Sequence, residues 1–201
     1  MPSALRLDVE SRTIEFDGTV AVDTTNPDTP DVYLELVACS PDTREHESLV
    51  VSPVAPSSIH AALLTVGATP GAPGRVSVTA DGIARTPATG TPLAVEFIWS
   101  DDSGHRHVSA PSEWIRSESG VAVTEFQWVF AGSRFVVRGG REVYDADGTG
   151  TLIGLTTFGS EVIAPRVTLS PNAATDAPAF LARNEAMPRA GTPVTVRVRA
   201  N

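Results

Sequence analysis

The side chains best suited to chemistry gather between residues 35 and 60. Glu35 and Cys39 are followed by the run Glu45-His46-Glu47-Ser48, and His60 comes soon afterwards. Imidazole and carboxylate groups are the ligands that zinc and similar divalent ions prefer, and catalytic sites commonly use three of them. We therefore expect His46, His60 and Glu47 to hold a divalent metal such as zinc, with Glu35, Cys39, Glu45 and Ser48 completing the polar cluster.

Two other interpretations of this cluster stay open. Ser48 could be the nucleophile of a hydrolase with His46 or His60 as its base, although no Gly-x-Ser-x-Gly elbow surrounds it. Alternatively, the cluster is a buried hydrogen-bond network that fixes a helix on a sheet in a structural or protein-interaction module. All three interpretations require the segment that carries His60 to pack on the strand that carries His46.

Two shorter motifs resemble metal sites less closely. His105 and His107 are two residues apart after a turn, so they face the same way on a strand, but solvated histidines are the favoured interpretation. The segment Asp145–Gly150 resembles the start of a calcium loop. Thr156 stands where that loop needs its glutamate, so a hairpin turn is expected instead.

The three tryptophans, Trp99, Trp114 and Trp128, could offer an aromatic face to a sugar or a peptide. Two of them alternate with phenylalanines along predicted strands, which is typical of core packing. Core positions are therefore the favoured prediction.

The composition excludes several classes of protein. All 15 basic residues are arginine, so lysine Schiff-base chemistry and a lysine-containing phosphate loop are excluded. A net charge of −9 argues against nucleic acid as a partner. The single cysteine, Cys39, permits no internal disulfide and cannot alone hold an iron–sulfur cluster. No apolar run reaches the roughly 18 residues of a membrane span. Since the charge also argues against nucleic acid, a protein or a glycan is the partner to consider.

Hydrophobic alternation predicts strands over most of the chain. The clearest are Val32–Cys39, returning as Glu45–Ser52 after a turn, and Thr91–Trp99, returning as His105–Ser109. Short strands are also expected within residues 5–22, with Asp17-Gly18 as a hairpin turn, and over Thr192–Arg199. Residues 69–74 are expected to form a loop.

One segment has the period of a helix. Ile59, Ala62, Leu63 and Val66 form an i, i+3, i+4, i+7 stripe, proline precedes it and Gly67 follows it, so we expect a helix over residues 57–66. The chain therefore reads as a single mainly β domain over residues 1–201, β-sandwich-like or α+β, with antiparallel sheets and one substantial helix. Residues 1–4 are expected to be disordered and 170–191 irregular, with a possible short helix at 179–183.

The ordered motifs of the chain resemble the YdjY-type domain family of bacterial proteins, from residue 5 onward over nearly the whole length. The matching motifs are Glu35 and Cys39, Glu45–Ser48, Ile59–Ala68 with Pro70-Gly71, Trp99–Gly104 with Arg106-His107, Glu113–Arg116, Trp128–Ser133, Ala146–Gly148 and Gly191–Val194. The resemblance places Cys39, His46, Glu47, Ser48 and His60 in the family's pattern but supplies no role for them, since the family has no established activity. The N-terminus lacks an apolar signal-peptide core, so the protein is either cytoplasmic or begins after a removed leader. Export leaders in many relatives imply the second, a secreted or envelope-associated setting with the leader removed.

Overall fold

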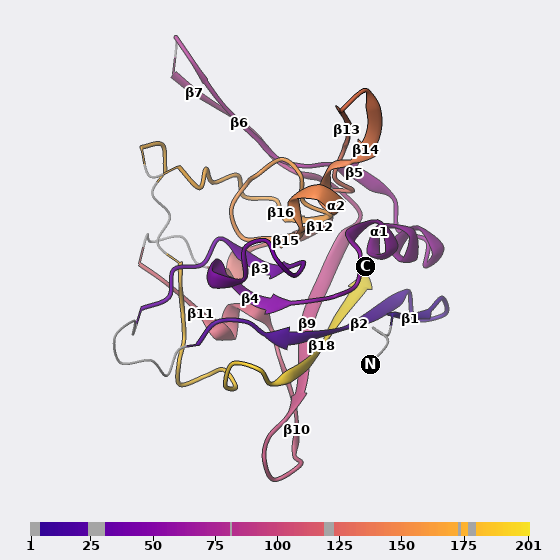
Figure 1. Ribbon diagram of the computed structural model, residues 1–201, viewed down its shortest axis with the longest axis vertical. Coiled ribbons are helices and arrows are strands. Elements are labelled where there is room, and N and C mark those ends of the chain that lie inside the picture. Colours follow the sequence, from indigo (N-terminus) through magenta and orange to yellow (C-terminus); the bar gives the residue numbers. More distant parts are fainter. Residues whose placement is uncertain (1–4, 24–30, 81, 119–122, 173, 177–179) are drawn as a thin grey trace.

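The computed structural model describes residues 5–23, 31–80, 82–118, 123–172, 174–176 and 180–201. It is 43% strand and 13% helix, and its main feature is a closed β-barrel of eight strands (Figure 1). In order around the barrel these are β2 (Thr13–Val20), β18 (Pro193–Ala200), β9 (Pro92–Ser100), β12 (Trp128–Phe130), β16 (Ile163–Pro165), β15 (Thr151–Gly154), β3 (Leu36–Cys39) and β4 (Ser48–Val51). Pairing of β4 back onto β2, at Thr19 with Val51 and Val20 with Val50, closes the ring.

The prediction of a β-sandwich-like or α+β fold was therefore wrong. The alternating pattern was correctly predicted, but it is the same for a strand in a sandwich and a strand in a barrel. Closure depends on the pairing of β2 with β4, which the sequence pattern does not encode. The inside of a barrel of eight strands is just wide enough to be filled by side chains, and Phe16, Phe97 and Phe130 are fully buried in the core.

Two of the barrel pairings are parallel, which the sequence analysis did not predict. β3 pairs with β4 and β15 pairs with β16, each through a short connection, residues 40–47 and 155–162. The expected antiparallel return strand at 45–52 is instead a 3-10 turn, η1 (Glu45–Glu47), followed by the parallel β4. In both connections a glutamate carboxylate accepts two backbone N–H groups, Glu45 from Asp42 and Thr43 and Glu161 from Phe158 and Gly159. These bonds satisfy amides that a tight turn leaves without partners.

The predicted helix is confirmed as α1 (Pro56–Thr65), the single helix of seven or more residues in the described chain. Proline occupies its first turn, and Ile59, Ala62 and Leu63 are buried as the stripe requires. The Asp147 carboxylate accepts the N–H of Ser57 at 2.8 Å, so a residue 90 positions away caps the helix.

Three local predictions need correction. Asp17-Gly18 lies inside the continuous strand β2, where Gly18 is needed because a Cβ would come 2.5 Å from the Val50 side chain. The expected turn at 145–150 is a short helix, α2 (Asp145–Thr149), ended by left-handed Gly150. The expected loop at 69–74 contains β5 (Pro70–Ala72), which pairs with β8 (Thr89–Gly90).

The C-terminal third also holds an unexpected strand. β17 (Phe180–Ala182) pairs with β11 (Ile115–Ser117), so these residues are not helical as suggested, while the rest of the described part of 170–191 has neither helix nor strand. Residues 1–4, 177–179 and 173 lie outside the described residues. Two 3-10 turns, η2 (Pro111–Trp114) and η3 (Val123–Glu125), precede β11 and β12.

Four strands project from the barrel as hairpins. β6 (Arg75–Thr79) pairs with β7 (Gly82–Thr86), and β13 (Phe135–Arg138) pairs with β14 (Arg141–Tyr144), both at the upper end of the molecule in Figure 1. Val78, Phe135 and Val137 on these hairpins are largely exposed.

Two further strands extend one side of the barrel. β1 (Leu5–Asp8) pairs with the first half of β2, on the edge that β4 occupies further along. β10 (Arg106–Ser109) pairs with the last residues of β9, on the edge that β12 occupies at the other end. The outer face of β2, β18 and β9 is therefore flanked by an extra strand at each end. Among the described residues, no helix is long and apolar enough to cross a membrane.

Candidate functional site

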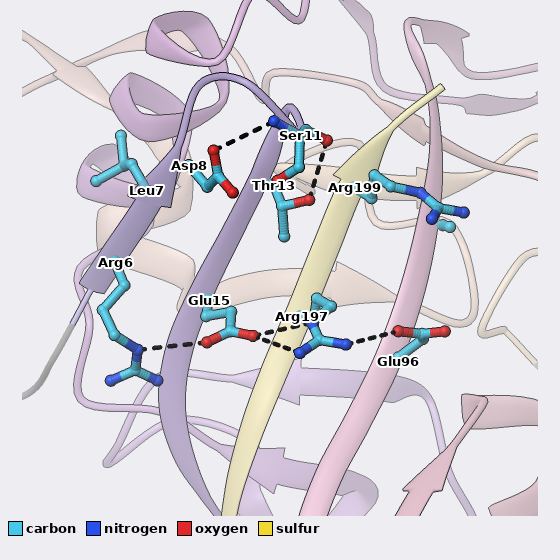
Figure 2. A pocket seen from close by; sticks show the side chains of 10 residues that line it. Arg6, Leu7, Asp8, Ser11, Thr13, Glu15, Glu96, Arg197 and Arg199 are labelled. Atoms are coloured by element: carbon cyan, nitrogen blue, oxygen red, sulfur yellow. Dashed lines mark hydrogen bonds and ion pairs between the residues drawn. The ribbon is translucent and has the colours of Figure 1, made fainter.

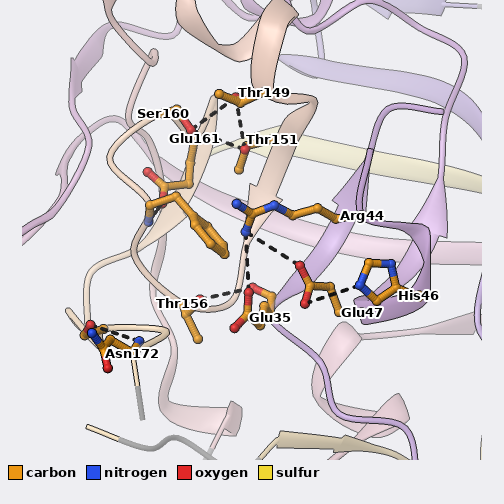
Figure 3. A network of polar contacts seen from close by, with 12 residues as sticks. Glu35, Arg44, His46, Glu47, Thr149, Thr151, Thr156, Ser160, Glu161 and Asn172 are labelled. Carbon is orange, nitrogen blue, oxygen red and sulfur yellow. Dashed lines mark hydrogen bonds and ion pairs between the residues drawn. The ribbon is translucent and has the colours of Figure 1, made fainter. Parts of the chain in front are cut away.

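The predicted polar cluster is centred on a residue that the sequence analysis overlooked, Arg44. Its guanidinium lies 3.4 Å from Glu35 and 3.6 Å from Glu47, and it stacks over the Phe158 ring at 4.0 Å (Figure 3). Burial and the neighbouring Glu47 carboxylate raise the pKa of Glu35. Arg44 thus offsets two partly buried carboxylates and joins the connection 40–47 to the connection 155–162.

His46 and Glu45 lie at the edge of this cluster. The His46 ring is 79% exposed and sits 3.9 Å from the Glu47 carboxylate. Glu45 caps its own turn through the amides of Asp42 and Thr43. The hydrogen bond from its own backbone N–H, together with those two, lowers its pKa. Glu45 therefore stabilises the backbone of the turn.

Cys39 and Ser48 are fully buried in the barrel wall. The Ser48 hydroxyl donates to the Val50 carbonyl at 3.1 Å, and burial raises the pKa of the Cys39 thiol. A serine nucleophile has to reach substrate and a base, and the Ser48 bond is to the backbone of its own strand. The Ser48 hydrolase stays a prediction, and nothing in this geometry favours it.

His60 belongs to a separate cluster at the other end of the predicted site. Its Nδ1 lies 2.9 Å from the Tyr144 hydroxyl, which donates to the Gly132 carbonyl at 3.0 Å. Since the single Tyr144 proton is used in that bond, Nδ1 of His60 is the donor to Tyr144. Burial lowers the pKa of His60 and raises that of Tyr144, so both groups are neutral near pH 7. His60 also packs edge-on against Phe130, which fixes α1 on the barrel.

The expected convergence of the metal ligands is absent. Among the residues that the structure describes, no three or more histidine, cysteine, aspartate and glutamate side chains gather where they could hold a metal ion. His46, His60 and Glu47 are therefore not brought together in the described chain.

The weaker candidate motifs have other roles. His105 and His107 both contact the Asp101 carboxylate, at 3.6 and 2.9 Å. Asp145 is buried and pairs with Arg134 and Arg138. The histidine contacts with Asp101 therefore hold the β9–β10 hairpin, and the ion pairs of Asp145 hold α2.

Glu161 is the second residue that the sequence analysis overlooked. It is fully buried, burial raises its pKa, and its carboxylate accepts the amides of Phe158 and Gly159. A hydroxyl network of Thr149, Thr151 and Ser160 adjoins it (Figure 3). A glutamate between the turn residues Gly159-Ser160 and the apolar run Val162–Ala164 was the available signal.

Two hollows lie on the outer face of β2, β18 and β9, and neighbouring residues of the same strands line both. The charged hollow, about 410 Å³, is bounded by β1 and contains Arg6, Glu15, Arg197 and Glu96 in a ladder of alternating ion pairs (Figure 2). Each charge in this ladder meets an opposite charge on the next strand, so the hollow is close to neutral.

The tryptophan hollow, about 690 Å³, lies at the end bounded by β10. It is lined by Asp17, Gly18, Thr19, Pro53, Ile98, Trp99, Ser100, Arg106, Pro193, Val194 and Thr195. Trp114 and Trp128 are buried as predicted, but Trp99 is only partly buried and stacks face to face on His107, with ring centres 4.2 Å apart. His107 is itself held by Asp101 at 2.9 Å, so the indole is fixed in place.

Comparison with known proteins gives a single kind of match. The family model described as the YdjY domain matches residues 5–199. No curated protein and no solved structure matches the chain.

Proposed function

The chain belongs to the YdjY domain family, and on that premise we propose that it is an extracytoplasmic binding domain that recognises a neutral glycan chain. The binding site would be the outer face of β2, β18 and β9, with the tryptophan hollow at its centre. The observation that carries the proposal is the hollow itself, with Trp99, held against His107, among the residues that line it.

The apolar part of the hollow suits a sugar ring. A pyranose has one face of C–H groups, which packs on an aromatic ring much as other apolar groups do. Trp99 cannot turn away without losing its stack on His107. Little side-chain conformational entropy is therefore lost when a ligand binds. Pro53 and Pro193 add rigid apolar surface to the lining of the hollow.

The polar part of the hollow suits hydroxyl groups. Asp17 supplies acceptors and Arg106 supplies a fork of donors, while Ser100, Thr19 and Thr195 supply both. A largely apolar pocket with a few polar groups, and a volume between roughly 300 and 1,000 Å³, is typical of small-molecule sites.

The charges favour an uncharged ligand. The neighbouring charged hollow pairs its arginines and glutamates with one another, and the whole chain carries a net charge of −9. The negative net charge would repel a polyanion at long range. At short range, Arg6 and Arg197 of the charged hollow are already paired with glutamates. On the outer face that carries both hollows, β18 is paired on both sides, so it offers no free strand edge to an extended peptide.

The test is affinity electrophoresis in gels that contain neutral polysaccharides, followed by titration of tryptophan fluorescence. Trp114 and Trp128 are buried, so a change in emission on binding would report on Trp99. We expect Trp99→Ala to weaken binding at least tenfold, about 1.4 kcal/mol, and Phe135→Ala, an exposed aromatic on β13 outside the hollow, to leave it unchanged. Failure of every neutral polysaccharide to retard the protein, or equal binding by Trp99→Ala, would reject the proposal.

A further inference from the structure

A third hollow, about 460 Å³, lies where the root of the β6–β7 hairpin meets the segment before β13 and the turn after β15. Arg75, Ser133, Arg134 and Gly159 are among the residues that line it, and we call it the arginine pocket. It shares no residue with the tryptophan hollow or the charged hollow.

Arg134 is held rigidly at the wall of this pocket. Its Nε donates to the Asp145 carboxylate at 2.9 Å, and Asp145 is only 2% exposed. Asp145 also accepts from Arg138 at 2.6 Å, so one carboxylate is shared by two guanidinium groups. The nearby Glu161 carboxylate is used by the amides of Phe158 and Gly159. Arg134 itself is about half exposed, and its two terminal nitrogens make no hydrogen bond to the residues that the structure describes.

Arg75 supplies a second cation from β6. It is exposed, and no carboxylate among the described residues lies within ion-pair distance of it. An arginine without an acidic partner is a candidate for pairing with a ligand, because its fork of donors matches an oxyanion in two-point geometry.

Ser133 adds a buried hydroxyl, 8% exposed, that lies beside the Tyr144 hydroxyl. Its Oγ makes no hydrogen bond of good geometry with the described residues. Its backbone is left-handed, with φ of 54°, which a serine rarely adopts and which is commonly retained at functional sites. Gly159 leaves the approach to Arg134 free of a side chain, since a Cβ there would come 3.6 Å from an Arg134 terminal nitrogen.

From these observations we propose that the arginine pocket binds a small molecule through an oxyanion, either a phosphate, a sulfate or a carboxylate. Arg75 and Arg134 would clamp the anion, and the volume leaves room for a small organic group attached to it. This site is independent of the glycan-binding proposal, since the two share no residue.

The test is calorimetric titration with inorganic phosphate, sulfate and acetate at an ionic strength held constant with chloride. The intact protein should show saturable binding of at least one of these ions, and the ion preferred identifies the chemical group. Arg75→Gln and Arg134→Gln should each weaken binding at least tenfold. Arg166→Gln, an exposed arginine that contacts Gln127 elsewhere on the surface, should not.

Arg134→Gln also removes a partner of Asp145 and could unfold the region, whereas Arg75 has no described partner to lose. Arg75→Gln therefore decides the outcome. Absence of saturable binding by the intact protein, or unchanged binding by Arg75→Gln, would overturn the inference. Trp99→Ala should bind the anion normally, so the two proposals fail separately.

Discussion

At the scale of single residues, Arg44 explains how the predicted cluster is held together. The carboxylates of this cluster are evident from the sequence, and the nearby histidines favoured a metal as the group that joins them. The partner is Arg44, which contacts both Glu35 and Glu47. The turn at η1 decides which of the neighbouring charged side chains pair with one another. Residue types alone do not predict that turn.

Replacement of Arg44 by methionine should destabilise the protein by about 1–3 kcal/mol at pH 7, because two partly buried carboxylates lose their counter-charge. The pKa of Glu35 is already above its usual value of 4.5. As the pH falls through this range Glu35 takes up a proton, so the stabilisation that its pairing with Arg44 gives is present above this range and is lost below it. The difference in free energy of unfolding between wild type and variant should therefore shrink between pH 7 and pH 4.

Urea denaturation at the two pH values measures this difference. Arg141→Met, which removes an exposed arginine with no described partner, is the control and should change stability little at either pH. A gap of the same size at pH 4 and pH 7 would show that Arg44 acts through packing on Phe158 instead of through charge.

At the scale of elements, local hydrophobic periodicity was enough to predict the helix and the longer strands. α1, the β9–β10 hairpin and β18 lie where the pattern put them. The parallel pairs and the strands β5 and β17 were missed, because short connections and three-residue strands carry little periodic signal. His60 was expected to meet His46, but α1 presents it to Tyr144 and Phe130. The register between a helix and a barrel is set by packing, which the sequence pattern leaves open.

Gly90 on β8 offers a test of how closely the elements pack. A Cβ there would lie 2.0 Å from the Phe130 carbonyl, and φ is 132°. Gly82 on β7 has a φ of 128° but nothing within 4 Å. Gly90→Ala should therefore lower the melting temperature by at least about 8 °C, and Gly82→Ala by no more than about 4 °C, at roughly 2–4 °C per kcal/mol.

Thermal unfolding followed by circular dichroism compares the two variants directly. Because the backbone strain is nearly matched, the difference reports on steric contact alone. Equal shifts would mean that β8 does not approach β12 as closely as described.

At the scale of the whole molecule, β18 joins the two ends of the chain. It pairs with β2 along Thr13–Thr19 on one edge and with β9 along Leu93–Ile98 on the other. β1, by contrast, lies outside the ring of eight strands and pairs with β2 alone.

Deletion of residues 193–201 should therefore abolish cooperative unfolding, because β2 and β9 would each lose a neighbour along most of their length. Deletion of residues 1–8 should leave a cooperative transition at a lower melting temperature, since the barrel stays closed. Calorimetry of both truncated chains checks this pair, and a cooperative transition without β18 would contradict the described topology.

The position of β18 also has a consequence for protein synthesis. A ribosome makes residues 193–200 long after β2 and β9, at roughly 5–20 residues per second. Until those residues leave the exit tunnel, two long strands with apolar faces have open edges that invite pairing with other chains. The barrel is thus completed only after β18 has been translated. In that interval the growing chain exposes strand edges of the kind that lead to aggregation when they stay unpaired.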